Sequence, residues 1–348
     1  MKLRIALIQP YFGTLPNYFP FALETYAHNA TIEWHIFTDD RTPYAYPPNV
    51  SVTYTTLDRL KRRFQPYFAF PIALERPYKL CDYKPLYGHL FADQIKGCDF
   101  WGYFDPDVIF GDLGRFITEQ VCQKYDKLCL RGHFSLFRNT PAVNLLYQSS
   151  VANCLYYKNV LSSERNWGFG ERDNGVNAFF ATRNLPVYTA LPIADIFYLD
   201  YAMRLANGAT DEREKARQSC FAYQQGKLYR YYSTGAGIRC EEFMYIHLMR
   251  RRMEVLCGNT TEYLIYGNAF RKMEPITGGL LQSTNKNRPL YLLREKFRML
   301  VYIRYLKPVW RRLFVDRDYG RLGVGLLQKC RLLDRSRRRS QPGIRGAA

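Results

Sequence analysis

An alternation of strand, helix and strand near the N-terminus limits the folds open to this 348-residue chain more than any other feature. The apolar run Leu3–Ile8 predicts a buried strand that ends in a loop punctuated by proline and glycine. A helix is expected from about 17 to 28, and Ile32–Thr38 predicts a second strand. Because such a unit places its two strands in parallel, the sequence predicts an α/β fold with a mostly parallel central sheet flanked by helices.

Further elements continue this alternation along the chain. Strands are expected at 51–54, 127–131 and 228–233, and helices at 57–64, from about 82 to 95, at 113–125 and at 144–161. Asp82 and Asp112 stand where each could cap its helix. Residues 186–199 are expected to be extended.

An aromatic and β-branched stretch, Phe100–Phe110, carries two carboxylates near its middle. Residues of this kind suit a buried strand, and open α/β sheets bind ligands at strand ends. Pro106 fixes its own φ, so Asp105 and Asp107 stand in a rigid turn. Two carboxylates this close repel each other unless a cation lies between them, and Mg²⁺ or Mn²⁺ bridging to a diphosphate meets that need. We favour a metal site here over a turn with two solvated acids.

A second acidic pair, Asp39 and Asp40, follows the strand at 32–38. In a parallel sheet the strand ends share one edge, so both acidic pairs are expected to line one crevice. Asp39 or Asp40 would there accept hydrogen bonds from a ribose or a base. A turn that begins before Arg41 explains this pair equally well.

His247 is the most informative of the five histidines. A neutral imidazole is a good Mn²⁺ ligand beside carboxylates. Arg250 opens a run of three arginines, and guanidinium groups suit phosphate oxygens. A metal-binding His247 followed by arginines would place positive charge beside a departing diphosphate. A core histidine before an exposed basic helix is the alternative interpretation.

Two further groups contain polar side chains at element ends. His133 follows Gly132, where it could contact a substrate hydroxyl or satisfy a buried backbone group. Glu171, Asp173 and Asn174 stand at a helix start, where they could hold sugar hydroxyls or deprotonate an acceptor. Asp173 as a simple helix cap is the alternative.

Charge and cysteine usage separate a globular body from a basic segment. The net charge is +19, of which residues 288–348 contribute +13, from 17 basic and 4 acidic side chains. Nine scattered cysteines without a C-x-x-C pair argue against a disulfide framework or a zinc ribbon and favour a reducing cytoplasm. We expect no signal peptide, because the first apolar run is short, and no segment approaches the ~18 apolar residues of a membrane span.

The basic segment mixes cations with large apolar residues at helical spacing over Leu292–Leu306, and Trp310 and Phe314 follow. A basic amphipathic helix of this kind lies on anionic membranes. We therefore expect residues 258–348 to form a basic helical extension, with a disordered Arg-rich end, at the inner face of the cell membrane. A helix packed on the domain is the alternative. No nucleic-acid-binding motif accompanies the charge, so no nucleic acid is expected.

The motifs together resemble those of bacterial GT-A-type glycosyltransferases from polysaccharide-biosynthesis loci. The similarity lies at Pro10–Gly13, Phe37–Asp40 and Trp101–Leu113, and extends over about residues 3–255. It implies a GT-A-like nucleotide-diphospho-sugar transferase domain at 1–257. The segment Cys81–Lys84 is similar to the Ser-Asp-x-x-Arg segment of related enzymes, although its cation stands one place earlier.

The resemblance also implies roles for individual residues. The residues that would bind the nucleotide sugar are Tyr11, Phe12, Asp39, Asp40, Asp82 and Lys84, with Arg250 added for the phosphates. The ligands of Mn²⁺ or Mg²⁺ would be Asp105, Asp107 and His247. The candidate catalytic residues near the transferred sugar are Asp173 and Asn174.

The activity implied is metal-dependent transfer of a sugar from a nucleotide-diphosphate donor to a hydroxyl of a glycan or lipid-linked glycan, in cell-surface polysaccharide synthesis. Two alternatives stay open. A haloacid-dehalogenase-like phosphatase also uses Asp-x-Asp after a strand, but it needs a further acidic pair downstream, whereas Asp39 and Asp40 lie upstream. A basic membrane- or nucleic-acid-associated protein without catalysis is the other.

Overall fold

The computed structural model describes residues 3–196, 203, 205, 218–249 and 251–284. These residues belong to a compact unit that spans 1–287. Arg250 and residues 285–348 lie outside the described residues, so the expected membrane-binding helices and the phosphate role of Arg250 stay predictions. Within the described part of the chain, no helix combines the length and apolarity needed to cross a bilayer.

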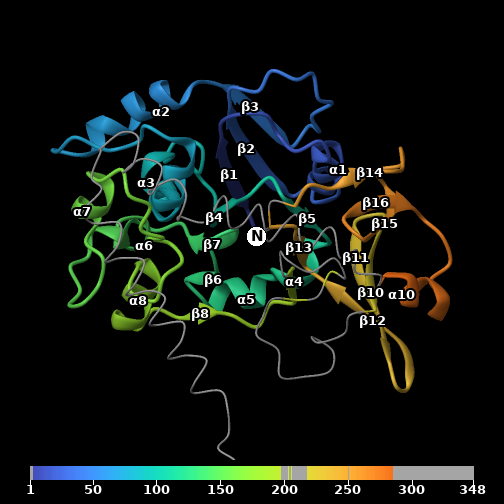
Figure 1. The fold of residues 1–348 in the computed structure, drawn as a ribbon. Helices are drawn as coiled ribbons and strands as arrows, with labels where there is room; N and C mark the ends of the chain where they lie inside the picture. The colour runs from blue at the N-terminus through green and yellow to red at the C-terminus, as the bar shows by residue number, and fades with distance from the viewer. Residues whose placement is uncertain (1–2, 197–202, 204, 206–217, 250, 285–348) are drawn as a thin grey trace, which may run out of the picture. The chain divides into compact units, whose positions relative to one another are not determined.

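A seven-stranded sheet in the order β3-β2-β1-β4-β7-β6-β8 organises the N-terminal two-thirds of the described chain (Figure 1). Four of its six neighbouring pairs are parallel, and only the pairs that β7 makes with β4 and β6 are antiparallel. The mixed α/β fold with a large central sheet is therefore confirmed. Its strands are β1 Ile5–Tyr11, β2 Ile32–Thr38, β3 Val50–Tyr54, β4 Phe100–Phe104, β6 Lys127–Arg131, β7 Phe134–Arg138 and β8 Val187–Tyr188.

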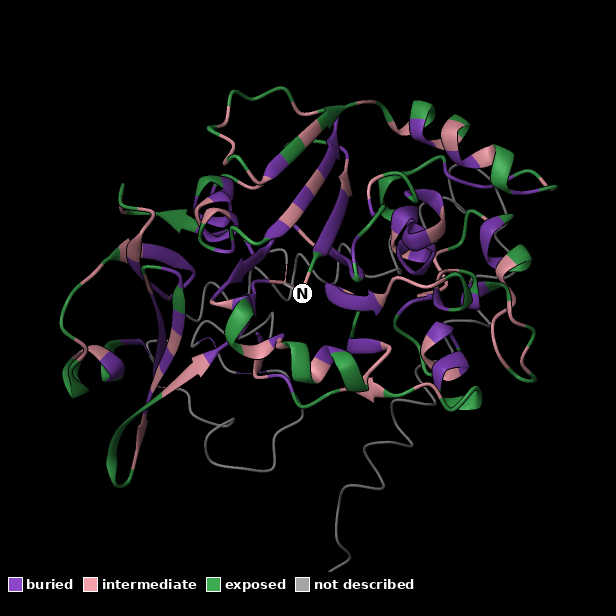
Figure 2. Cartoon of the chain, turned by 180° about the vertical axis from the view of Figure 1, so that it is seen from behind, coloured by how far each residue is buried: buried purple, intermediate pink, exposed green. Residues whose placement is uncertain are grey.

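Two hydrophobic cores lie on the two faces of this sheet, because successive side chains of a strand point to opposite sides. In β1, Leu7 packs in one core and Ile8 in the other. In β4, Phe104 and Tyr103 divide in the same way. Burial on both faces explains why these strands are apolar throughout, and Figure 2 shows them as almost entirely buried.

The helices around the sheet are shorter than their sequence patterns indicate. The expected helix at 82–95 is instead two 3₁₀ turns and one short helix, since Pro85 cannot donate to an α-helical ladder. Asp112 does cap a helix, but that helix ends at Phe116 and Thr118 caps a second one. The helical segments are α1 Phe19–His28, α2 Leu57–Phe64, η1 Gln65–Tyr67, η2 Pro77–Asp82, η3 Lys84–Leu86, α3 Tyr87–Leu90, α4 Leu113–Phe116, α5 Glu119–Lys124, α6 Pro141–Asn144, η4 Leu146–Gln148, α7 Tyr157–Leu161, α8 Val176–Thr182 and α10 Gly278–Thr284.

A small three-stranded sheet lies directly after the Asp105–Asp107 turn. It consists of β5 (Val108–Phe110), β13 (Tyr245–His247) and β9 (Ile193–Asp195), with β13 in the middle. The strand β13 is antiparallel to β5 and parallel to β9. Three segments that are distant in sequence thus meet beside the two acids.

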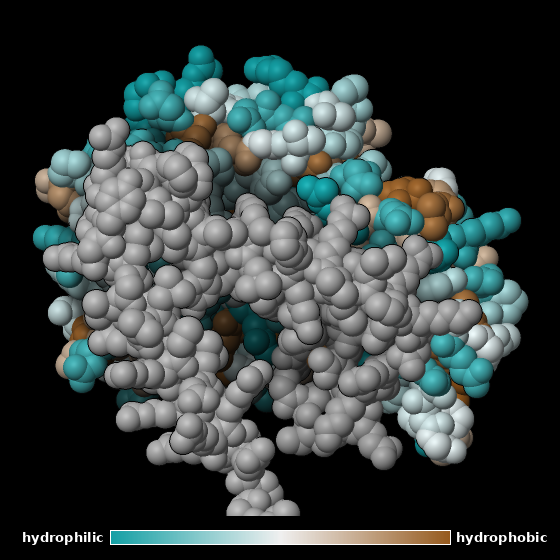
Figure 3. Space-filling view, in the orientation of Figure 1, coloured by the Kyte–Doolittle hydropathy of each residue, from teal (hydrophilic) through white to brown (hydrophobic). Residues whose placement is uncertain are grey.

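A third, six-stranded sheet has the order β12-β11-β10-β15-β16-β14. Its strands are β10 Ser219–Gln224, β11 Lys227–Thr234, β12 Gly237–Phe243, β14 Glu254–Val255, β15 Glu262–Tyr266 and β16 Ala269–Lys272. The domain boundary expected at residue 257 falls between β14 and β15 of this sheet. The sheet therefore includes β15 and β16, which lie in the segment expected to be a helical extension. Figure 3 shows a described surface on which hydrophilic residues predominate and hydrophobic ones lie in small groups.

Candidate metal centre

The Asp105–Asp107 turn connects β4 to β5 and is held by backbone contacts from two other segments. The Asp105 amide donates to the carbonyl of His133 at 3.0 Å, and the Leu248 amide donates to the carbonyl of Asp107 at 2.9 Å. Asp107 is buried, whereas the Asp105 side chain is 32% exposed. The turn therefore presents one enclosed and one accessible carboxylate at the carboxyl end of a central strand.

His247 reaches this turn because of strand register. It pairs with Val108 on β5 and with Asp195 on β9. Its Nε2 atom lies 3.6 Å from Oδ1 of Asp107. Ligand atoms of Asp105, Asp107 and His247 all lie within 4.8 Å of one another. The three residues assigned to a metal from the sequence thus form one cluster.

Asp195 is a member of this site that the sequence reasoning missed. Its Oδ1 atom accepts from Nδ1 of His247 at 2.8 Å. A carboxylate in this position fixes the tautomer and the orientation of an imidazole ligand. The available signal was an acid at the end of the short apolar run Ile193–Asp195, the same pattern that marked Asp105.

A second imidazole packs against the first. The His133 ring stacks on the His247 ring with centroids 3.9 Å apart, and its Nε2 atom lies 3.0 Å from the Tyr245 hydroxyl. Burial lowers the pKa of His133 well below its ordinary value, with the charge of His247 acting in the same direction. His133 is thus a neutral buried partner of the Tyr245 side chain, whereas the alternative in the sequence analysis was a buried backbone group.

Two carboxylates control the charge of His247. Burial alone would lower its pKa, but the charge and hydrogen bond of Asp107 and the contact with Asp195 raise it to about 10. The imidazole is therefore protonated at neutral pH when nothing else is bound, and a metal ligand must first lose that proton.

Lys84 supplies a second positive charge to the acid pair. Its Nζ atom donates to Asp105 Oδ1 at 2.6 Å and to the carbonyl of Gly132 at 2.7 Å. Burial would lower the pKa of Lys84, but the charge of Asp105 raises it above its ordinary value. The repulsion that led us to expect a bound cation is thus already reduced by two cations of the protein, Lys84 and His247.

The proposed nucleotide loop is tied to the end of β2. Asp39 accepts from the Gly13 amide at 2.7 Å, and Asp40 accepts from the Leu15 amide at 2.8 Å. Tyr11 donates through its hydroxyl to the carbonyl of Thr14 at 3.2 Å. Phe12, which follows Tyr11, is buried in a core. The acids therefore shape the loop after β1, and Asp39 is exposed beside it.

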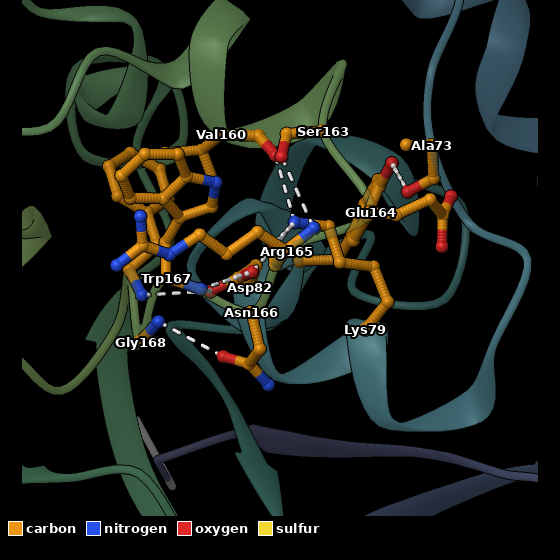
Figure 4. A network of polar contacts seen from close by, with 12 residues as sticks. Ala73, Lys79, Asp82, Val160, Ser163, Glu164, Arg165, Asn166, Trp167 and Gly168 are labelled. Atoms are coloured by element: carbon orange, nitrogen blue, oxygen red, sulfur yellow. Dashed lines mark hydrogen bonds and ion pairs between the residues drawn. The ribbon is translucent and has the colours of Figure 1, made fainter. Parts of the chain in front are cut away.

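Asp82 was expected to contact the nucleotide sugar, but its side chain lies in the interior of the protein. Its carboxylate is fully buried, pairs with Lys79 at 2.8 Å and accepts from the Trp167 amide (Figure 4). It also accepts from the Phe169 amide. The Lys79 ammonium also donates to the carbonyl of Arg165. A ligand has no access to this carboxylate, so Asp82 organises the loop at 165–169.

The acidic loop before α8 approaches the site through Glu171. A Cβ atom at Gly132 would lie 1.9 Å from Oε1 of Glu171, so that side chain packs directly over the glycine whose carbonyl binds Lys84. Asp173 and Asn174 are exposed, and no described contact joins them to the metal cluster. Asp173 is also not the helix cap, because Gly175 occupies that position.

The donor set fits a hard divalent cation. Two carboxylates and one imidazole suit Mn²⁺ and, with more water, Mg²⁺, and His247 has the outer carboxylate that metal-bound histidines usually have. The partly exposed Asp105 leaves room for ligands from solvent or substrate. The residues present are therefore suitable for such an ion, with Lys84 as a competitor at Asp105.

Comparison with known proteins places the chain in a family. A family model described as "Family of unknown function (DUF6625)" matches residues 7–274. The chain belongs to this family. No curated protein matches the chain in sequence.

Two solved structures of the galactosyltransferase LgtC are among those to which the chain is similar. One is a complex with donor and acceptor sugar analogues, at 14% identity and a TM-score of 0.33, covering 61% of this chain and 82% of LgtC. The other is an active-site mutant, at 13% identity and a TM-score of 0.32, with the same coverage.

Proposed function

We propose that this protein is a GT-A-like, metal-dependent glycosyltransferase that takes a sugar from a nucleotide-diphosphate donor. The observation that carries the proposal is the cluster of Asp105, Asp107 and His247 at the carboxyl edge of the large sheet. Strands β2, β1 and β4 are consecutive neighbours, so Asp39, the loop after β1 and Asp105 follow three adjacent parallel strands. This edge is where open α/β sheets bind nucleotides.

Each part of the site suits one part of such a donor. Asp39 and the loop at 11–15 would bind the nucleoside, and Lys84 would contact the diphosphate. When bound, the metal would supply Lewis-acid stabilisation of the departing diphosphate. Asp105, Asp107 and His247 would hold it, and Asp195 would orient His247 by accepting a hydrogen bond from its Nδ1–H group.

The acceptor side is proposed to include the loop before α8. Asp173 and Asn174 remain candidates for contact with the sugar, and Glu171 is added because of its packing over Gly132. A carboxylate there is suited to accept the proton of an attacking hydroxyl. A glycan or lipid-linked glycan would be the acceptor, and the basic segment after residue 287 would keep the protein at an anionic membrane.

Calorimetric titration with UDP, GDP, ADP and TDP, each with and without Mn²⁺, tests this function. We expect one nucleotide to bind in a metal-dependent manner and Asp107→Ala to abolish that dependence. Asp58→Ala is the matched control, because Asp58 lies exposed on α2 and pairs with Arg62. Binding that is indifferent to metal and to Asp107→Ala would contradict the proposal.

A screen of nucleotide sugars for Mn²⁺-dependent hydrolysis would then identify the donor. Cleavage of a phosphate monoester such as p-nitrophenyl phosphate, without hydrolysis of any nucleotide sugar, would favour the phosphatase alternative. In a transfer assay with the identified donor and a glycan acceptor, Glu171→Gln and Asp173→Asn distinguish the two acids of the acceptor loop. The variant with the larger loss of transfer marks the acid that contacts the acceptor.

A further inference from the structure

Lys84 lies where a metal ion would compete for Asp105. Its Nζ atom is 2.6 Å from Oδ1 of Asp105, and its side chain is only 8% exposed. The Tyr103 ring lies beneath the ammonium, with its centroid 5.4 Å from Nζ. Charge-assisted contacts are strong when they are short and shielded from water. Lys84 therefore neutralises Asp105 firmly before any ion binds.

The same carboxylate belongs to the candidate metal cluster. An oxygen that already accepts from an ammonium is a poorer ligand for a divalent cation, and two neighbouring cations repel each other. Sharing of Asp105 between a metal ion and the Lys84 ammonium is favoured when the ammonium gains an anion in exchange. A diphosphate is such an anion, and the proposed function brings one to this place.

We propose that Lys84 is an exchangeable counter-ion, which neutralises Asp105 while the site is empty and transfers its contact to the diphosphate when metal and nucleotide bind together. This inference rests on the proposed function. An ammonium has three N–H donors. Asp105 and Gly132 take two of them, and no described residue takes the third. That donor can bind a phosphate oxygen before the contact with Asp105 is released.

The exchange has a thermodynamic consequence. Metal alone binds weakly, because Lys84 competes with it for Asp105 and has no other anion as a partner. Metal with a nucleoside diphosphate binds more tightly, since the ammonium then has a new partner. By linkage, each ligand raises the affinity of the other by the same factor. Lys84 thereby favours loading of the ion together with the donor.

The test measures Mn²⁺ binding from the loss of the electron paramagnetic resonance signal of free Mn²⁺, after subtraction of the loss that the same nucleotide causes without protein. It uses the full chain, with and without UDP, GDP, ADP or TDP. Lys84→Met keeps the apolar stem and removes the charge. We expect this variant to bind Mn²⁺ alone about tenfold more tightly than the unmodified protein, since one charge-assisted contact no longer competes. It should also lose most of the coupling to the nucleotide.

Two control variants show whether the effect depends on a positive charge at residue 84. Lys84→Arg keeps a cation and should retain weak Mn²⁺ binding and strong coupling. Lys158→Met removes the same charge from an exposed site on α7 and should leave both quantities unchanged. If Lys84→Met proves unfolded by circular dichroism, the coupling in the unmodified protein decides, because the exchange requires that nucleotide tighten Mn²⁺ binding.

The outcomes separate the two proposals. Equal Mn²⁺ affinity in the unmodified protein and Lys84→Met, with unchanged coupling, overturns the exchange and leaves the metal site in place. No Mn²⁺ binding in any variant, with or without nucleotide, overturns the metal-dependent function as well.

Discussion

The Nδ1 atom of His247 lies 2.8 Å from Oδ1 of Asp195. This contact turns the other nitrogen of the ring towards Asp107. Because Asp195 is on β9 and His247 on β13, the parallel pairing of these strands creates the relationship. The imidazole is thus positioned by the sheet and by the carboxylate of Asp195.

We expect Asp195→Ala to weaken Mn²⁺ binding in the presence of the preferred nucleotide by about 10- to 100-fold, as for other outer-shell partners of metal-bound histidines. Asp195→Asn should lose less, because its amide oxygen still accepts from Nδ1. Mn²⁺ titration measures both effects, and the thermal midpoint reports any loss of folding. Equal Mn²⁺ affinity in all three proteins would show that Asp195 does not position His247.

The buried pair of Lys79 and Asp82 is expected to be important for stability. Asp82→Ala leaves the Lys79 ammonium without its carboxylate in a fully buried place, and breaking such a pair costs about 3–5 kcal/mol. Urea denaturation measures this loss. The exposed pair of Asp58 and Arg62 provides the comparison, since Asp58→Ala should cost only about 0.5 kcal/mol. Similar losses for the two variants would contradict the structural role of Asp82.

Lys127 predicts a pH-dependent stability. It is buried beside the Phe137 ring, and burial lowers its pKa to about 7. Between pH 7 and its unfolded pKa of about 10.4, the unfolded chain binds more protons than the folded one, so this lysine makes stability rise with pH, by at most ~1.4 kcal/mol per unit. Below pH 7 both states are protonated, and its unfavourable contribution is complete and constant.

Lys127→Met removes this contribution. The free energy of unfolding of Lys127→Met minus that of the unmodified protein should therefore decrease as pH rises from 7 to 9. Urea denaturation at several pH values measures the difference, with the exposed Lys158→Met as the control. A difference that is independent of pH would refute the prediction.

Gly102 should not tolerate a side chain. A Cβ atom there would lie 2.4 Å from the carbonyl oxygen of Ser135 and 2.8 Å from Cδ2 of Leu7, inside the large sheet. The contact with the Ser135 backbone cannot be relieved by rotating a side chain, so Gly102→Ala should cost about 1–3 kcal/mol as an overpacked core residue does. Gly235→Ala, with no atom within 4 Å of the added carbon, is the matched control. Denaturant midpoints compare the two.

Local pattern was sufficient for the strands of the large sheet that frame the site. Ile32–Thr38 forms β2 with the expected bounds, and the aromatic run before Asp105 forms β4. A continuous apolar run indicates a strand buried on both faces, because successive side chains of a strand point to opposite sides. Local pattern failed for the segment from Asp82, where apolar residues at helical spacing pack as 3₁₀ turns around Pro85.

What the sequence by itself determined is that two acids follow a buried strand in an α/β sheet, with a histidine suited to join them. Only the tertiary structure decided that Lys84 and Asp195 complete the group and that Asp82 does not. These partners are separated by 21 residues for Lys84 and Asp105 and by 52 for Asp195 and His247. Contacts over such separations depend on strand register and on the paths of loops, which no local pattern of side chains specifies.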